Sequence, residues 1–224
     1  MIAVKDSVSI EWQGEFLDLL PDRAVYWPKE KVLYVADTHF GKAATFRKVG
    51  IPVSEHTTKE DCSRLANLVK ITGAEQLTIL GDFLHARAGR AQPVRNILFD
   101  WRDQHKELSI VLIRGNHDQQ SGDPWPELDI ECMPDPTEAK RWDLRHLPVE
   151  SPPRPYLAGH LHPGYRLSGT GRDTLRNPCF VVGEERLILP AFAGFTGLKN
   201  VTLEPYEKLY LTNGNEIILL SKTV

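Results

Sequence analysis

The sequence is poor in cysteine, has no excess of basic charge and contains no long apolar run. Its three cysteines, Cys62, Cys132 and Cys179, are an odd number without metal-type spacing, which favours a reduced intracellular protein over a disulfide scaffold. The formal net charge is -3, which argues against nonspecific nucleic-acid binding through bulk charge. The N-terminal segment is charged and broken every few residues, so it predicts neither a signal peptide nor a membrane span. We therefore expect a cytoplasmic protein without a membrane partner.

The length of 224 residues and the hydrophobic content of 41% are enough for one sizeable core. The sequence contains no clear linker, no repeat of fixed period and no low-complexity tract. We therefore expect residues 1–224 to form a single domain.

Three apolar segments, 31–36, 77–80 and 108–113, predict buried strands, and each is followed at once by polar residues. Helical spacing of apolar residues follows the first two, over 57–73 and 93–106. This alternation predicts an α/β fold with polar clusters at the carboxyl ends of the strands. In open α/β sheets that edge is where ligands bind.

The two ends of the chain have a different pattern. Two short strands are predicted near the N-terminus, around 12–16 and 24–27. After residue 120, proline and glycine breaks separate further short strands and a hairpin, predicted at 141–147, 155–158, 180–182, 187–189 and around Asn213-Gly214.

Carboxylate, amide and imidazole side chains gather in five short segments of the chain. These segments are Asp37-Thr38-His39, Gly81-Asp82, Gly115-Asn116-His117-Asp118, His146 and Gly159-His160-Leu161-His162. Mixed oxygen and nitrogen ligands suit manganese, iron or zinc better than calcium. A pair of divalent metal ions is one of the few means of hydrolysing phosphate esters at neutral pH. The segments therefore favour a metal-dependent phosphoesterase.

The spacing within these segments suggests how they reach a metal. In an extended backbone, residues two apart point the same way, so Asp37 and His39 could share one ion. The same geometry applies to His160 and His162. Asp82 follows a buried strand, and its carboxylate could bridge two ions.

Each segment also has a simpler interpretation, because Asp-x-His, Gly-Asp and Gly-Asn-His-Asp sequences often form ordinary turns. The combination is what carries weight. Three polar clusters each end an apolar run, and five of the eight histidines belong to the set.

The series Asp-x-His, Gly-Asp, Gly-Asn-His-Asp and Gly-His-x-His resembles the calcineurin-like metallophosphoesterase superfamily over about residues 31–165. The resemblance implies an α/β four-layer metallophosphoesterase sandwich, in which two mixed β-sheets are flanked by helices. It implies two divalent metal ions and a single domain that includes all of the polar segments.

The resemblance also implies a role for each of these residues. One ion would be held by Asp37, His39, Asp82 and His162, and the other by Asp82, Asn116, His146 and His160, with Asp82 bridging. His117 would be the general acid, oriented by Asp118. Since the surroundings of His146 are not distinctive, a plain surface histidine is the alternative there.

Further segments resemble the bacterial ligase-associated DNA-damage-response endonuclease family. They are 36–42, Phe46-Arg47, 50–52, 80–86, 189–192 and Phe195-Thr196-Gly197, whereas Ala193 and Leu198 stand where glycine is expected. This resemblance implies a manganese-dependent phosphodiesterase or nuclease that acts on DNA in repair. It also implies an ATP-dependent DNA ligase or a helicase as partner.

Positive side chains close to the ligand segments could form a mouth for a polyanion. The residues we assign to substrate binding are Lys42, Arg47, His85, Arg87 and Arg114. For any one arginine or lysine the alternative is an ordinary solvated charge, and His85 could merely pack against its loop. Phe40, Phe83 and Phe192 could stack on a base, although core packing is the simpler reading of each.

Two other functions use the same residues. A phosphatase or phosphodiesterase for small nucleotides needs the same metal site, and only the length of the substrate would separate it from a nuclease. A non-catalytic scaffold would keep the fold to dock partners, but it would have no need of the acid His117. The sequence does not indicate the oligomeric state.

Overall fold

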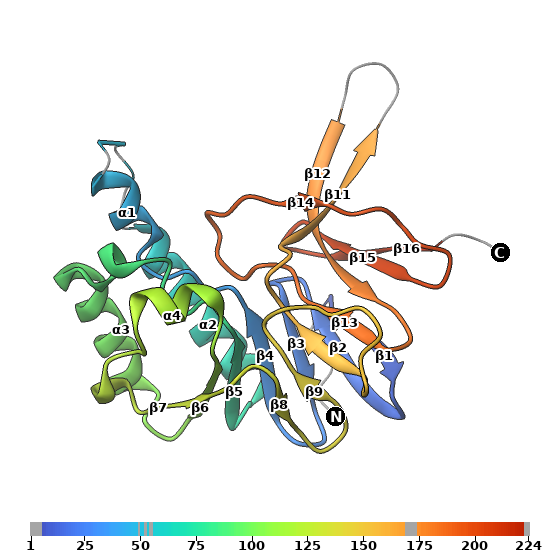
Figure 1. Cartoon of the computed structure of the whole chain (residues 1–224), viewed down its shortest axis with the longest axis horizontal. Helices are drawn as coiled ribbons and strands as arrows, with labels where there is room; N and C mark the ends of the chain where they lie inside the picture. Colours follow the sequence, from blue (N-terminus) through green and yellow to red (C-terminus); the bar gives the residue numbers. More distant parts are fainter. Residues whose placement is uncertain (1–5, 49, 52, 54–55, 169–173, 222–224) are drawn as a thin grey trace.

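The computed structural model describes residues 6–48, 50–51, 53, 56–168 and 174–221. Over these residues the chain folds into two β-sheets that pack against each other, with the helices gathered beside the first sheet (Figure 1). This is the predicted α/β sandwich of two mixed sheets. Among the described residues no helix follows Leu128, so the helical cover belongs to the first sheet.

The first sheet is built from the N-terminal half of the chain. Its seven described strands are arranged in sequence order, β1 (Val8–Trp12), β2 (Glu15–Leu20), β3 (Ala24–Trp27), β4 (Val32–Ala36), β5 (Gln76–Leu80), β6 (Ser109–Ile113) and β7 (Ile130–Met133). Strands β1 to β4 pair antiparallel, and β4 to β7 pair parallel. The carboxyl ends of the parallel strands therefore lie along one edge.

Helices connect the parallel strands and cover one face of this sheet (Figure 1). They are α1 (Lys42–Lys48), α2 (His56–Thr72), α3 (Gln92–Gln104) and α4 (Asn116–Ser121), with short 3-10 turns η1 (Arg87–Arg90) and η2 (Pro126–Leu128). Strand β4 is buried on both faces. Leu33 and Val35 join the core beneath the helices, whereas Tyr34 and Ala36 join the core between the sheets.

The second sheet comes from the C-terminal half. Its strands are β8 (Thr137–Glu138), β9 (Asp143–Leu144), β10 (Tyr156–Ala158), β11 (Pro163–Ser168), β12 (Thr174–Val182), β13 (Arg186–Ile188), β14 (Lys199–Asn200), β15 (Lys208–Thr212) and β16 (Ile217–Ser221). The order is β14-β11-β12-β13-β10-β9-β8, and β15 pairs with β12 and β16. Trp142 is fully buried between the sheets, with ring centroids 5.3 Å from Trp12 and 4.7 Å from Trp27.

Most predicted elements are confirmed, including the three buried strands, the two long helices and the hairpin at Asn213-Gly214. The strand predicted at 12–16 is wrong. Gln13 and Gly14 have φ of 52° and 73°, and two successive positive φ values reverse the chain between β1 and β2. The strand predicted at 141–147 shrinks to β9, and the polar stretch after Asp37 contains an unpredicted helix, α1.

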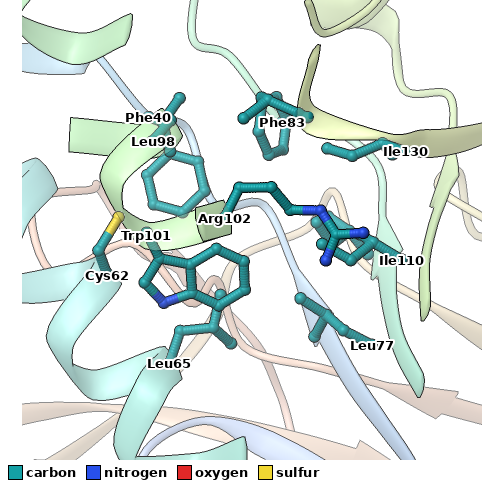
Figure 2. Close-up of a pocket in the computed structure, with 12 residues that line it drawn as sticks. Phe40, Cys62, Leu65, Leu77, Phe83, Leu98, Trp101, Arg102, Ile110 and Ile130 are labelled. Carbon is teal, nitrogen blue, oxygen red and sulfur yellow. The ribbon is translucent and has the colours of Figure 1, made fainter. Parts of the chain in front are cut away.

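The core beneath the helices encloses an apolar cavity of about 20 Å³, whose walls are shown in Figure 2. Arg102 reaches into it from α3, and its guanidinium donates hydrogen bonds to the carbonyl of Leu108 (2.9 Å) and to Asp129 (3.2 Å). A space of this size holds about one water molecule. The cavity is therefore a packing feature and not a ligand site.

In the part of the chain that the structure describes, no helix has both the length and the apolar composition needed to span a bilayer.

Candidate metal centre

The predicted ligands come from both sheets and meet at one edge. Asp37, Asp82 and Asn116 follow the carboxyl ends of β4, β5 and β6, while the histidines of the second sheet lie in the loops after β9 and β10. Backbone hydrogen bonds tie the loops together, from the amide of Asp37 to the carbonyl of Gly81 (3.2 Å) and from His39 to Asp82 (2.9 Å). The site therefore forms only where the two sheets come together.

The backbone is left-handed at five of the candidate ligands. The φ values are 53°, 44°, 55°, 67° and 46° for Asp37, His39, Asp82, His160 and His162. The extended backbone that we assumed for Asp37-x-His39 and His160-x-His162 is therefore wrong. Left-handed backbone is costly for residues other than glycine and gathers at functional sites, where the surrounding structure holds it in place.

The first cluster of ligand atoms is formed by Asp37, His39 and His162, whose atoms lie within 4.8 Å of one another. The Nε2 atoms of His39 and His162 are 3.2 Å apart. Oδ1 of Asp37 is 3.4 Å from Nε2 of His162. Side chains from both sheets thus point at one small space.

The second cluster is formed by Asp82, His146 and His160, again within 4.8 Å. Nε2 of His146 lies 2.9 Å from Oδ1 of Asn116, 3.0 Å from Nδ1 of His160 and 3.4 Å from Oδ1 of Asp82. His160 and His162 therefore belong to different clusters, because their left-handed backbones turn the two side chains apart.

His146 is fully buried, so the alternative of a plain surface histidine is wrong. Its Nδ1 lies 3.1 Å from the carbonyl of Leu80. When Nδ1 donates to this carbonyl, the lone pair of Nε2 faces the cluster, where Oδ1 of Asn116 is a second donor atom for an ion. A backbone carbonyl that fixes the tautomer in this way is the usual support of a metal-binding histidine.

Asp82 lies between the two clusters. Its Oδ1 faces His146 of the second cluster, and its Oδ2 is 3.9 Å from Nε2 of His39 in the first. Burial raises the pKa of this carboxyl above its ordinary value, and the nearby Asp37 raises it further. A site with this concentration of carboxylates calls for positive charge.

Two observations test whether these residues suit a metal ion. Oδ1 of Asp37 is buried and accepts no hydrogen bond, which costs about 1–3 kcal/mol for an isolated polar atom. Burial, the nearby His162 and the charge of Lys42 lower the pKa of His39, so the neutral imidazole that binds metals is favoured. Carboxylate, amide and neutral imidazole donors fit a divalent ion of the manganese, iron or zinc type.

His117 lies at the open side of the clusters, with Nε2 3.8 Å from Oδ2 of Asp82. Its Nδ1 donates to the carbonyl of His85 at 2.5 Å, and the two imidazole rings stack with centroids 5.0 Å apart. The backbone carbonyl of His85 therefore fixes the ring, and Nε2 faces the site.

The predicted contact between Asp118 and the ring of His117 does not occur among the described residues. Asp118 lies in the first turn of α4, and its carboxylate points back to accept hydrogen bonds from the amides of Asp82 (2.8 Å), Phe83 (2.9 Å) and Gly115 (2.8 Å). It thus joins two ligand loops. Burial raises the pKa of Asp118 to about 6.

Two of the predicted substrate-binding residues lie at the clusters. The rings of His85 and His39 meet edge to face with centroids 5.2 Å apart. Nζ of Lys42 donates to the hydroxyl of Thr196 (3.0 Å). Burial lowers the pKa of His85, and the positive charge of Lys42 lowers it further. Lys42 therefore carries its charge to the edge of the site.

The other three predicted substrate-binding residues form hydrogen bonds outside the ligand clusters. Arg47 donates to the carbonyl of Val53 (2.7 Å) and Arg87 to that of Gln120 (3.1 Å). The guanidinium of Arg114 forms a bidentate pair with Asp123 through bonds of 2.7 and 2.8 Å. None of these hydrogen bonds links the three side chains to a residue of the ligand clusters.

The aromatic candidates for base stacking, Phe40, Phe83 and Phe192, are all buried in the core beneath the helices. Thr196 has a contact that we did not predict, because its hydroxyl lies 3.2 Å from Nδ1 of His162. The segment Phe195-Thr196-Gly197 was part of the narrower resemblance, which was the signal for this contact.

Comparison with known proteins agrees with this geometry. The family model described as calcineurin-like phosphoesterase matches residues 30–182. The crystal structure of Pseudomonas putida nuclease MPE is 43% identical, with a TM-score of 0.85 over 96% of this chain and 100% of that chain. This similarity is consistent with the narrower resemblance to DNA-repair endonucleases.

A second solved structure is much less similar. The structure of Yfce, a phosphoesterase from E. coli, is 15% identical with a TM-score of 0.43, over 86% of this chain and 99% of that chain. No curated protein sequence matches the chain significantly. The family model and the nuclease structure argue against a non-catalytic scaffold, and the chain belongs to the calcineurin-like phosphoesterase family as a metal-dependent phosphoesterase.

Proposed function

We propose that this protein is a dinuclear-metal phosphodiesterase that cleaves DNA, and that it acts in DNA repair. The observation that carries the proposal is the position of Asp82, whose two carboxylate oxygens face separate ligand clusters. A bridging carboxylate is what two neighbouring ions require. The choice of DNA is supported by the 43% identity to a protein described as a nuclease.

The proposed ligand sets divide along the two clusters. Asp37, His39, Asp82 and His162 would hold one ion, and Asp82, Asn116, His146 and His160 would hold the other. When bound, divalent ions at such a site neutralise charge on phosphoryl oxygens and make water a nucleophile at neutral pH. We propose manganese as the metal, with iron or zinc as alternatives that the same donors allow.

The protein's own part in the reaction follows from His117 and Lys42. Nε2 of His117 faces the clusters, and a protonated Nε2 there can give its proton to the leaving oxygen. Nδ1 stays on the carbonyl of His85, so the ring keeps its orientation while the proton moves. The ammonium group of Lys42, at the edge of the site, attracts and orients the phosphate.

The wider setting of the proposal rests on resemblance. A ligase or helicase partner and a role in repair are implied by the narrower family. We also propose that residues 1–224 form one domain, since β1 near the N-terminus joins the first sheet, and β15 and β16 near the C-terminus join the second.

The test is hydrolysis with manganese of three substrates, bis-p-nitrophenyl phosphate, p-nitrophenyl phosphate and a labelled single-stranded DNA. We expect turnover of the diester and of DNA, both abolished in Asp82→Ala together with the loss of both ions. Asp103→Ala, at an exposed position late in α3, is the matched control. Turnover of the monoester alone would indicate a small-molecule phosphatase, and two ions retained in Asp82→Ala would refute the bridging role.

A further inference from the structure

The hairpin β11–β12 begins directly after the candidate ligand His162 and projects beyond the rest of the second sheet (Figure 1). Arg166 on β11 and Arg176 on β12 are direct cross-strand partners, so their side chains lie on the same face. Both residues are exposed. We call the face of the hairpin that carries Arg166 and Arg176 the arginine face.

The charges of the arginine face have no acidic partner among the described residues. The side chain of Arg166 forms no hydrogen bond or ion pair with them, and the side chain of Arg176 donates to the backbone carbonyl of Leu198. Like charges directly opposite each other destabilise an antiparallel pair. The pairing of two arginines at neighbouring exposed positions is therefore costly to the free protein and calls for an anion.

One loop contacts both the arginine face and the first ligand cluster. Gly164 precedes Arg166 by two residues and so lies on the same face, where Leu198 packs so closely that a Cβ on Gly164 would be 2.9 Å from its Cβ. The loop that carries Leu198 also carries Thr196, whose hydroxyl is 3.2 Å from Nδ1 of His162. One loop thus joins the arginine face to the first ligand cluster.

The distance along the hairpin matches a chain of several nucleotides. Arg166 lies four positions after His162, which corresponds to about 13 Å of strand. A small diester bound at the clusters would not reach that far, whereas the backbone of a polynucleotide would.

An exposed aromatic ring lies in the same loop, next to Thr196. Phe195 is 41% exposed, and its ring is supported edge to face by Phe46 of α1 at 5.4 Å. A supported and accessible ring is a stacking platform for a base whose own face is free, which is the case in a single strand and not in a duplex.

We propose that the arginine face and Phe195 bind a single-stranded DNA beside the phosphate that is cleaved, with the arginines on its phosphates and the phenyl ring on a base. This inference rests on the proposed function. It explains how a protein with a net charge of -3 can bind a polyanion, because the positive charge is local.

The test compares wild type with Arg166→Ala plus Arg176→Ala, using the manganese-loaded enzyme on a 12-nucleotide single strand and on bis-p-nitrophenyl phosphate. We expect the ratio of kcat/KM for the 12-mer to kcat/KM for the small diester to fall by about tenfold or more. The slope of log(kcat/KM) for the 12-mer against log salt should become shallower by about 1.4, because two phosphate contacts on a single strand are lost.

Lys70→Ala plus Lys106→Ala is the matched control, since these exposed lysines lie in the last turn of α2 and just after the C-terminal end of α3, away from the ligand edge. Melting temperatures check folding. The single variants Arg166→Ala and Arg166→Glu are also compared, and Arg166→Glu should lower the ratio of kcat/KM values further. An unchanged ratio and salt slope, or equal losses on both substrates, would overturn the inference alone. A wild type that hydrolyses the small diester but no DNA would overturn the proposed function and this inference with it.

Discussion

Replacing Gly81 with alanine tests the support of His146 directly. Gly81 follows β5 with φ of +81°, and a Cβ there would lie 2.1 Å from Nδ1 and 2.4 Å from Cγ of His146. The imidazole cannot stay where it is, because no real Cβ contact is so short. Moving the ring breaks its bond to the carbonyl of Leu80 and withdraws Nε2 from Asn116 and His160.

Two terms set the magnitude. A left-handed alanine costs about 1–2 kcal/mol, and overpacking a buried site costs about 1–3 kcal/mol. Together they lower the free energy of unfolding by about 2–5 kcal/mol, which is roughly 4–20 °C in Tm for a domain of this size. Disturbing the support of a ligand typically weakens metal affinity by about 10- to 100-fold.

The assay is manganese titration by calorimetry, together with thermal unfolding of the metal-free protein. Gly14→Ala is the matched control, because Gly14 has φ of +73° but nothing within 4 Å of a Cβ. It carries the backbone cost without the clash, so it should bind both ions normally. A Gly81→Ala protein that binds two manganese ions with wild-type affinity would refute the assignment of His146 as a ligand.

Three further predictions concern other parts of the site. His117→Ala should keep both ions and lose about 10²- to 10⁴-fold in kcat on DNA. The loss on p-nitrophenyl esters should be smaller, because their leaving groups need no acid. Equal losses on both substrates would contradict the acid role. Thr196→Ala should weaken metal binding by about tenfold, because the hydroxyl supports Nδ1 of His162, and Thr196→Ser should restore it in the same titration. Burial and the neighbouring positive charges lower the pKa of His39, so below about pH 6.5 the unfolded chain takes up a proton that the folded chain refuses. In urea denaturation without metal, stability should therefore fall by about 1.4 kcal/mol per pH unit on acidification below that point, and His39→Gln should remove that part of the slope.

The parallel strands and their helices were predictable because local patterns specify them. The apolar runs that became β4, β5 and β6 and the helical spacing of α2 and α3 can be recognised without knowledge of the rest of the chain. The errors arose where a turn or a short helix left only a weak local signal in the sequence. Gln13-Gly14 is a turn between two segments of alternating apolar and polar residues, and α1 is a short helix in a polar segment.

The candidate site divides in the same way. Residue type and order nominated Asp37, Asp82 and the histidines, because few side chains bind divalent metals and they recur beside strand ends. The positive φ values of the ligands could not be read from the sequence, since neighbouring loops impose them against the local preference of each residue.

The sequence by itself determined the fold class and the set of side chains that could bind metal, because both depend on residue type and local periodicity. Only the tertiary structure decided which side chains meet. It assigned His160 and His162 to different clusters and tied Asp118 to backbone amides. It also paired Arg114 with Asp123 in an ion pair and placed Arg166 opposite Arg176 in neighbouring strands. The physical reason is that these contacts join segments whose distance and direction depend on how the two sheets pack.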